Sequence, residues 1–473
     1  MQTIAPSTPS ADRLPPLGPW SRWVMLGVLG FFLMMASGRV GNRDVAITLD
    51  LSRSLLVGSV DLPEHWKHVP KRPGGERTSQ FGIGHSLSLI PYALCGRAAA
   101  ALLPVVPRSE WEEFFVSLSN VPVAMLILYY LSRRWRLLGC GDRRIALGVL
   151  IGATATLIGP YAKLPFSDAG LALGVLAAWC HWMEGGWRSS MAAGLWLGVA
   201  YVSRRQADLV IPFLLVLMGV QTAVRRRWRD LLAVLLACLP ALVLRMAYNQ
   251  ARFGTYFAER HPGIPVTQVV QQAADHPLFF NAADVLLSER HGFLIYGFVP
   301  VVVLLLGVAG LYRRSLWDGL AAVWIPLTGV LVLSELFFGP GTSFGARYLL
   351  FAIPFLLLAW PGVPIPTRGV LGLPCALMVA GSMGLMATGF VLDPLPIETR
   401  MKQSTPPLGY FTACGLEWGR VLGFGDGSEP PELRADAGWN HDPFQRPDFW
   451  WCHAVARLRD RLQRAPQIPA SGK

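Results

Sequence analysis

The sequence predicts an all-α polytopic membrane protein: a bundle of about eleven transmembrane helices, with juxtamembrane helices in its first loop outside the membrane. Hydrophobic residues make up 52% of the chain and charged residues only 15%. Long apolar runs recur along most of the chain, and short arginine-rich breaks separate them. Such an alternation is typical of a protein that crosses a membrane several times.

Each expected transmembrane helix corresponds to one apolar run. In chain order the runs are residues 23–37, 111–131, 145–159, 169–182, 191–202, 209–224, 231–247, 293–311, 320–338, 348–360 and 370–390. A further stretch, residues 81–103, is apolar enough to cross but carries His85, Pro91 and Arg97. Its status has to be decided from the charges of the loops around it.

The positive charge of the chain sets the predicted topology. A net charge of +12 would suggest a nucleic-acid partner in a soluble protein, but here the arginines lie in short loops beside the spans. If residues 81–103 dip into the interface and return, the arginine clusters at 133–144, 225–229 and 313–314 all lie inside, as the positive-inside rule requires. We therefore expect a re-entrant or juxtamembrane helix there, an inside N-terminus and an outside C-terminal tail.

This topology divides the chain into three regions. We expect a disordered cytoplasmic tail over residues 1–22, a transmembrane domain over 23–390 and an extracytoplasmic C-terminal tail over 391–473. The transmembrane domain contains a first outside loop, 38–110, and a large outside loop, 248–292. These loops are long and polar, so the chemistry is expected there.

The seven cysteines give no metal signal, because those in or beside the spans have no CxxC or Cys/His spacing. Cys414 and Cys452 both lie in the predicted outside tail, where an oxidising compartment permits a disulfide. The sequence does not show how far apart the two thiols lie, so their pairing is left open.

Asp44 is the first candidate for catalysis. It stands between a predicted span and the amphipathic segment VAITLDLSRSLLVGSVDL, whose apolar face we expect to lie in lipid. A carboxylate at a headgroup boundary can accept a proton from an acceptor hydroxyl. The alternative is that Asp44 only caps the helix that follows it, because Asp is a favoured N-cap residue.

Several cations are expected on the same side of the membrane as Asp44. An anionic phosphate of a lipid-linked donor can be clamped by such groups, although arginine and lysine near span ends also snorkel to headgroups without any ligand. A second acid, Asp168, stands at the mouth of the next span. The cationic candidates are Lys163, Arg204, Arg205, Arg252 and Arg347.

The order of several motifs resembles a known family, over most of residues 24–390. The matching segments are Asp44 with the SRSLLVGSV that follows, SQFGIGHSL at 79–87, GPYAKLPFSD at 159–168, YNQARFGT at 248–255, HGFLIYGFVP at 291–300 and FGPGTSFGARYL at 338–349. They resemble the GT-C glycosyltransferases that use polyprenyl-phosphate sugars, including protein O-mannosyltransferases, the lipid A aminoarabinose transferase and rhizobial lipopolysaccharide-core transferases.

The resemblance implies a GT-C-like bundle in the bacterial cytoplasmic membrane, with its active site outside. It implies that Asp44 is the catalytic base of an inverting transfer and that Asp168 helps to hold the donor or a metal, so a divalent cation stays open as a cofactor. Arg347, next to Tyr348, and Arg205 would stabilise the departing phosphate. Many relatives carry Asp-Glu in the first loop, whereas Val45 follows Asp44 here, which puts a metal role of that loop in doubt.

The resemblance implies a membrane lipid, glycan or protein as acceptor, and does not say which sugar is transferred. Two other classes fit the composition. A transporter would also be helical and rich in glycine and proline, but no internal repeat with matching broken helices is visible. A non-catalytic scaffold for envelope assembly would keep the fold and tolerate loss of Asp44.

Overall fold

The computed structural model describes most of the predicted transmembrane domain. The described residues are 16–40, 42–66, 69, 71–72, 74–79, 81–256, 285–287, 292–336, 347–364 and 372–391. They are almost entirely helical, with one antiparallel pair of two-residue strands, β1 (Asp61–Leu62) and β2 (Arg77–Thr78). Cys414, Cys452 and both predicted tails, apart from residues 16–22 and 391, lie outside the described residues.

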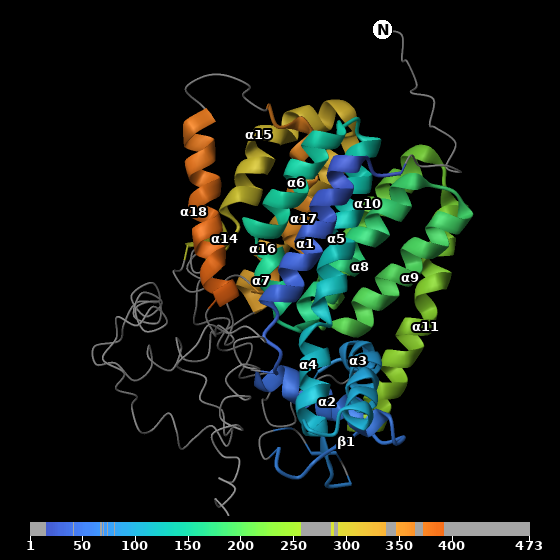
Figure 1. Ribbon diagram of the computed structural model, residues 1–473. Helices are drawn as coiled ribbons and strands as arrows, with labels where there is room; N and C mark the ends of the chain where they lie inside the picture. Colours follow the sequence, from blue (N-terminus) through green and yellow to red (C-terminus); the bar gives the residue numbers. More distant parts are fainter. Residues whose placement is uncertain are drawn as a thin grey trace, which may run out of the picture.

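Ten longer helices run roughly along one axis and form an upright bundle (Figure 1). They are α1 (Pro19–Met35), α5 (Asn120–Leu137), α6 (Asp142–Thr154), α8 (Ser167–Glu184), α9 (Trp187–Ser203), α10 (Ala207–Arg225), α11 (Trp228–Phe253), α15 (Phe298–Arg314), α16 (Leu316–Leu336) and α18 (Gly372–Val391). Shorter helices complete the bundle: α7 (Ile158–Lys163), α14 (Phe293–Tyr296), η1 (Arg347–Leu349), α17 (Ala352–Leu357) and η2 (Trp360–Gly362).

The helices have the composition of a membrane bundle. Within the described residues, three helical stretches are long and apolar enough to cross a membrane: Arg108–Leu137, Ala207–Arg225 and Trp228–Phe253. Shorter apolar helices accompany them: Pro19–Met35, Leu316–Val330, Ala352–Gly362 and Ala376–Gly389. The prediction of a polytopic all-α membrane protein is confirmed, and the number of eleven spans stays a prediction.

One predicted span is not a single helix. Residues 348–360 form parts of η1, α17 and η2, and Leu349, Phe355 and Trp360 are all at most 5% exposed. This broken segment is apolar because other helices surround it. A short apolar run cannot distinguish burial in protein from burial in lipid.

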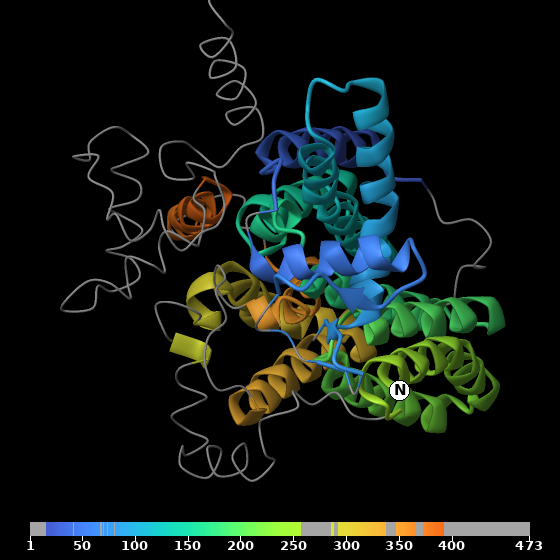
Figure 2. The same ribbon diagram turned by 90° about the horizontal axis from the view of Figure 1, so that it is seen from below.

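Two helices lie across the lower end of the bundle, α2 (Arg43–Leu55) and α3 (Ile83–Leu102). Figure 2, seen from below, shows their length where the bundle helices are seen more nearly end-on. The structure thus agrees with a juxtamembrane helix at residues 81–103. The next helix, α4 (Arg108–Ser117), leads into α5, and the arginine-rich turns 133–144 and 225–229 lie at the other end of the bundle.

The apolar face of α2 was expected in lipid, and this expectation is wrong. Val45, Ile47, Leu49 and Leu51 are each at most 2% exposed and pack within the hydrophobic core of the protein. Periodicity identifies the apolar face of a helix but not the material that covers it. The burial fixes α2 against the bundle, and with it the position of Asp44.

A buried glutamate in α4 links the helices at this lower end. Glu112 is 2% exposed and accepts from the Nε atoms of Arg53 in α2 at 2.7 Å, Arg97 in α3 at 3.0 Å and Arg108 in its own helix at 2.9 Å. Charge-assisted hydrogen bonds of this kind are stronger than neutral ones. They join α2, α3 and α4 into one layer.

Asp50 is the second acid of α2. Its carboxylate accepts from Arg53 Nη1 at 2.6 Å and from Trp66 Nε1 at 2.8 Å. The two acids of α2 therefore have different surroundings: Asp50 holds the loop after its own helix, and Asp44 turns toward the bundle.

Candidate active site

Asp44 does not cap α2. The N-cap is Asn42, whose side-chain oxygen accepts from the backbone N–H of Asp44 at 2.7 Å. The Asp44 carboxylate is therefore not needed to satisfy the helix terminus. Its side chain is 32% exposed, so a group from outside the protein can reach it.

Arg347 connects Asp44 to the second predicted acid. Its Nη2 lies 3.2 Å from Asp44 Oδ2 and its Nε lies 3.3 Å from Asp168 Oδ2. The guanidinium is only 4% exposed and stacks over the Phe166 ring, 4.4 Å from its centroid. Burial opposes the charge of Arg347, but the carboxylates of Asp168 and Asp44 raise its pKa above the usual value. Arg347 stays cationic between the two acids.

Arg204 holds the other side of Asp168. Its Nε lies 3.3 Å from Asp168 Oδ1, and its Nη1 donates to Ser167 Oγ at 2.9 Å. Tyr348 lies between the two arginines, with its ring 5.6 Å from the Arg204 guanidinium and 5.2 Å from that of Arg347. We call Asp44, Asp168, Arg204 and Arg347 the four-charge cluster. Its formal charge is zero.

The cluster joins four separate parts of the fold at the lower end of the bundle (Figure 1). Asp44 comes from the first turn of α2 and Asp168 from the first turn of α8. Arg204 directly follows α9, and Arg347 begins η1. The helix dipole favours acidic side chains in the first turn of a helix, and both carboxylates occupy such a position.

The cluster retains unused hydrogen-bonding capacity. Among the described residues, Arg347 Nε, Arg347 Nη1 and Asp168 Oδ2 are buried without a hydrogen-bond partner, since the Arg347–Asp168 contact is an ion pair without hydrogen-bond geometry. Buried polar atoms without partners are rare and call for an explanation. An anionic ligand that accepts from Arg347 would provide one.

The other predicted binding residues differ in their surroundings: Lys163 and Tyr348 are shielded from solvent, Arg205 is exposed, and Arg252 contacts backbone. Lys163, in the last turn of α7, is 1% exposed, and Tyr348 is half-buried against the cluster. Arg205 is exposed, unlike its neighbour Arg204. Arg252 donates from Nη1 to the carbonyls of Ser79 at 2.7 Å and Phe81 at 3.0 Å, and from Nη2 to Asn249. Arg252 thus anchors backbone.

His85 is a residue to which the sequence assigned no role of its own. Its Nε2 lies 2.8 Å from the carbonyl oxygen of Pro165, three residues before Asp168. Burial lowers the pKa of His85 to about 4, and Arg204 acts in the same direction. The only signal in the sequence was its place in the SQFGIGHSL motif.

A divalent cation does not fit this arrangement. Both acids that could ligate it share the guanidinium of Arg347, whose positive charge would face the ion. Among the residues that the structure describes, no group of three or more His, Cys, Asp and Glu side chains is arranged to hold a metal. The cluster offers guanidinium donors for an anion in place of ligands for a cation.

Comparison with known proteins finds similar solved structures. No protein-family model matches the chain, and no curated protein matches it. The chain is similar to ArnT from Cupriavidus metallidurans in the apo state, with 17% identity, 78% of this chain and 64% of that chain covered, and a TM-score of 0.48. For ArnT bound to undecaprenyl phosphate the values are 14%, 83%, 73% and 0.45. The chain thus spans less than two-thirds of the apo ArnT chain, and no activity follows from similarity at this level.

Proposed function

We propose that this protein is an integral-membrane glycosyltransferase that transfers a sugar from a polyprenyl-phosphate donor to a lipid, glycan or protein acceptor. The observation that carries the proposal is the guanidinium of Arg347, which contacts Asp44 and Asp168 together at one end of a membrane bundle. A base beside buried anion-binding donors is the equipment that such a transfer needs. By the positive-inside rule, this end faces the outside of the bacterial cytoplasmic membrane.

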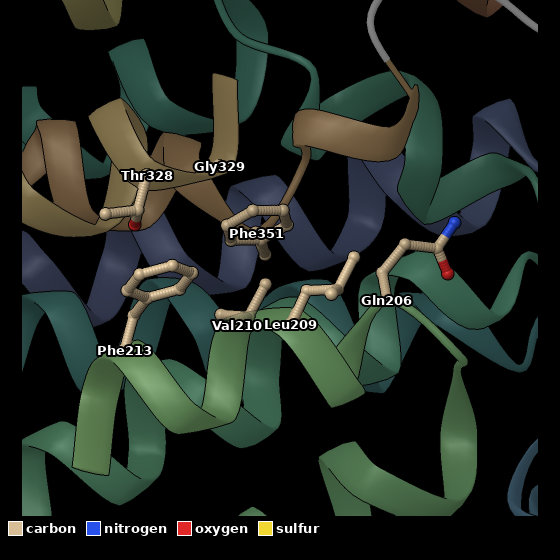
Figure 3. A pocket seen from close by; sticks show the side chains of 7 residues that line it. All are labelled: Gln206, Leu209, Val210, Phe213, Thr328, Gly329 and Phe351. Carbon is tan, nitrogen blue, oxygen red and sulfur yellow. The ribbon is translucent and has the colours of Figure 1, made fainter. Parts of the chain in front are cut away.

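An apolar groove beside the cluster supports a lipid-linked donor. It lies between α10, α16 and Phe351, and Figure 3 shows Phe213 and Thr328 at one end and Gln206 at the other. Arg204 Nε donates to Gln206 Oε1 at 2.9 Å. A chain in the groove would therefore bring its phosphate toward Arg204. The remaining lining residues are Leu209, Val210 and Gly329.

In the proposed reaction, Asp44 removes the proton from an acceptor hydroxyl. The acceptor oxygen forms a bond to the anomeric carbon, and the bond from that carbon to the phosphate oxygen breaks on the opposite face. The electron pair leaves with the lipid phosphate, so the configuration of the sugar inverts. Arg347 and Arg204 stabilise the departing phosphate by charge-assisted hydrogen bonds. Arg204 takes the role expected for Arg205, because it lies in the cluster.

The test is sugar transfer by the purified protein in lipid vesicles supplied with polyprenyl-phosphate sugars. Asp44→Asn keeps the size of the side chain and removes the base, so transfer should fall by about 10² to 10⁴-fold. Asp50→Asn is the matched control on the same helix, because Asp50 contacts Arg53 and Trp66 and not the cluster. It should retain transfer.

Equal transfer by wild type and Asp44→Asn would remove Asp44 from the mechanism. Absence of transfer from every donor tested, with folded protein, would overturn the proposal and favour transport or a scaffold role.

A further inference from the structure

The first turn of α3 contacts three of the four parts of the fold that carry the cluster: α2, the segment ahead of α8 and the end of α9. Ser52 of α2 donates its hydroxyl to the carbonyl of Ser86 at 2.8 Å, and His85 contacts the carbonyl of Pro165 ahead of α8 at 2.8 Å. Just before this turn, Arg252 at the end of α11 donates to the carbonyl of Phe81. The helix therefore connects segments that are far apart in the sequence.

Two glycines bring the same turn against the backbone that precedes Arg204. A Cβ atom on Gly82 would lie 2.7 Å from the carbonyl oxygen of Val202, and one on Gly84 would lie 2.6 Å from the carbonyl carbon of Val202. Since a real Cβ cannot approach backbone so closely, only glycine permits this contact. The turn thus sets the place of Arg204 from one side.

His85 sets the place of Asp168 from the other side. A carbonyl oxygen only accepts, so the ring nitrogen that faces Pro165 carries the proton, and His85 is the neutral Nε2–H tautomer. Ser88 Oγ is 3.5 Å from Nδ1 on the same helix. The side chain is buried, at 7% exposed. The charged groups that face it are Arg204 from the end of α9 and Asp168 from α8.

We propose that His85 is a positioning residue, which holds residues 164–168 through the Pro165 carbonyl so that Asp168 meets both Arg204 and Arg347. The part of this inference that concerns catalysis rests on the proposed glycosyltransferase activity. The part that concerns structure does not, because it predicts how the segment ahead of α8 behaves in the resting protein.

The structural part is tested by hydrogen–deuterium exchange of peptides covering residues 158–170 in the full-length protein in lipid nanodiscs. His85→Leu keeps an apolar side chain of similar reach but cannot donate, so exchange over 164–168 should rise by roughly tenfold. His85→Gln can donate from its amide to the same carbonyl and should exchange like wild type. Leu94→Ala is the control on the same helix, because Leu94 is 46% exposed, and it should also match wild type.

Unchanged exchange at 164–168 in a folded His85→Leu protein would overturn the proposal, and so would a His85→Gln protein that exchanges as fast as His85→Leu. If His85→Leu fails to fold, the comparison of His85→Gln with His85→Asn replaces it, because the shorter amide of Asn does not reach Pro165. Wild-type exchange in His85→Asn then counts against the proposal.

Sugar transfer supplies the catalytic part. We expect kcat to fall roughly tenfold in His85→Leu and to recover in His85→Gln, with the donor KM changing less than kcat. A wild-type protein that transfers no sugar would defeat the proposed function, while the exchange data would still decide whether His85 holds the segment. Faster exchange over residues 164–168 without any loss of kcat in His85→Leu would defeat the catalytic part alone.

Discussion

Arg347 Nη2 lies 3.2 Å from Asp44 Oδ2, although 303 positions separate the two residues in the chain. The contact joins a juxtamembrane helix near the N-terminus to the segment that enters the buried centre of the bundle. Because Arg347 also contacts Asp168, a single guanidinium sets the distance between the proposed base and the second acid. The geometry of the site therefore depends on one side chain more than on any other in the cluster.

Replacing Arg347 should damage both stability and transfer. Arg347→Gln leaves the buried Asp168 carboxylate with Arg204 as its remaining ion-pair partner, and breaking a buried pair typically costs about 3–5 kcal/mol. Thermal unfolding in nanodiscs would show the loss. The double variant Arg347→Gln with Asp168→Asn restores the zero formal charge of the cluster, so it should recover part of the stability and none of the transfer. Full activity in either variant would contradict the proposed role of Arg347.

Adjacent arginines should differ in donor binding. Arg204 is 11% exposed and contacts Asp168 and Ser167, whereas Arg205 is exposed. Arg204→Gln should weaken the binding of polyprenyl phosphate by roughly tenfold or more, because a hydrogen bond to a charged group contributes about 1.5–3 kcal/mol. Arg205→Gln should change the Kd by less than about twofold. Titration of the protein with polyprenyl phosphate measures both Kd values. Equal effects would show that Arg204 contributes no more to binding than Arg205 does.

The groove should make donor use depend on chain length. Leu209 lines it, so the larger indole of Leu209→Trp would occupy space intended for a lipid chain. We expect the KM for a long polyprenyl donor to rise, while the KM for a short water-soluble analogue stays near wild type. Val220→Trp is the control on the same helix, because Val220 is 51% exposed and does not line the groove. A rise for both donor lengths would place the lipid chain elsewhere.

We expect the protein to become less stable as the pH decreases, because His85 is neutral in the folded state. Its pKa is lowered from 6.5 to about 4 by burial and by Arg204, against the opposing effects of the Pro165 carbonyl and Asp168. The folded state therefore prefers the neutral ring, and the unfolded chain takes up a proton first as the pH falls. The contribution is present above pH 6.5 and is lost between pH 6.5 and 4, by at most about 1.4 kcal/mol per unit of pH.

The measurement is the thermal midpoint between pH 7 and pH 5, compared with that of His85→Gln, whose side chain does not titrate. Wild type should lose stability more steeply over this range. Parallel curves would show that His85 does not take up a proton on unfolding.

The sequence indicates single candidate residues more readily than the contacts between them. Asp44, Asp168, Arg204 and Arg347 were all candidates because acids and cations at span ends are informative in a membrane protein. Nothing local indicates that Arg347 joins the two acids, since that contact depends on how the helices fold together. For the same reason the sequence could not separate Arg204 from Arg205 or show that Arg252 binds backbone carbonyls.

The fold shows the same division. The positive-inside rule placed the helix at residues 81–103 correctly beneath the bundle, because loop charge reports topology directly. Apolar periodicity failed for α2 and for residues 348–360, where the apolar surface is covered by protein. Apolar side chains are stabilised wherever they are removed from water, and both lipid and the protein interior do this.

The layer of α2, α3 and α4 should tolerate substitution of its arginines better than substitution of Glu112, because all three arginines share this one carboxylate. Loss of Arg97 or Arg108 would leave Glu112 with two cationic partners. The helices α2, α3 and α4 would still be joined by the remaining hydrogen bonds or by the chain itself. Loss of Glu112 would leave three guanidinium groups facing one another. Lineages that carry this protein should therefore lose the arginines one at a time but keep the glutamate, and a random mutant library selected for function should show the same asymmetry.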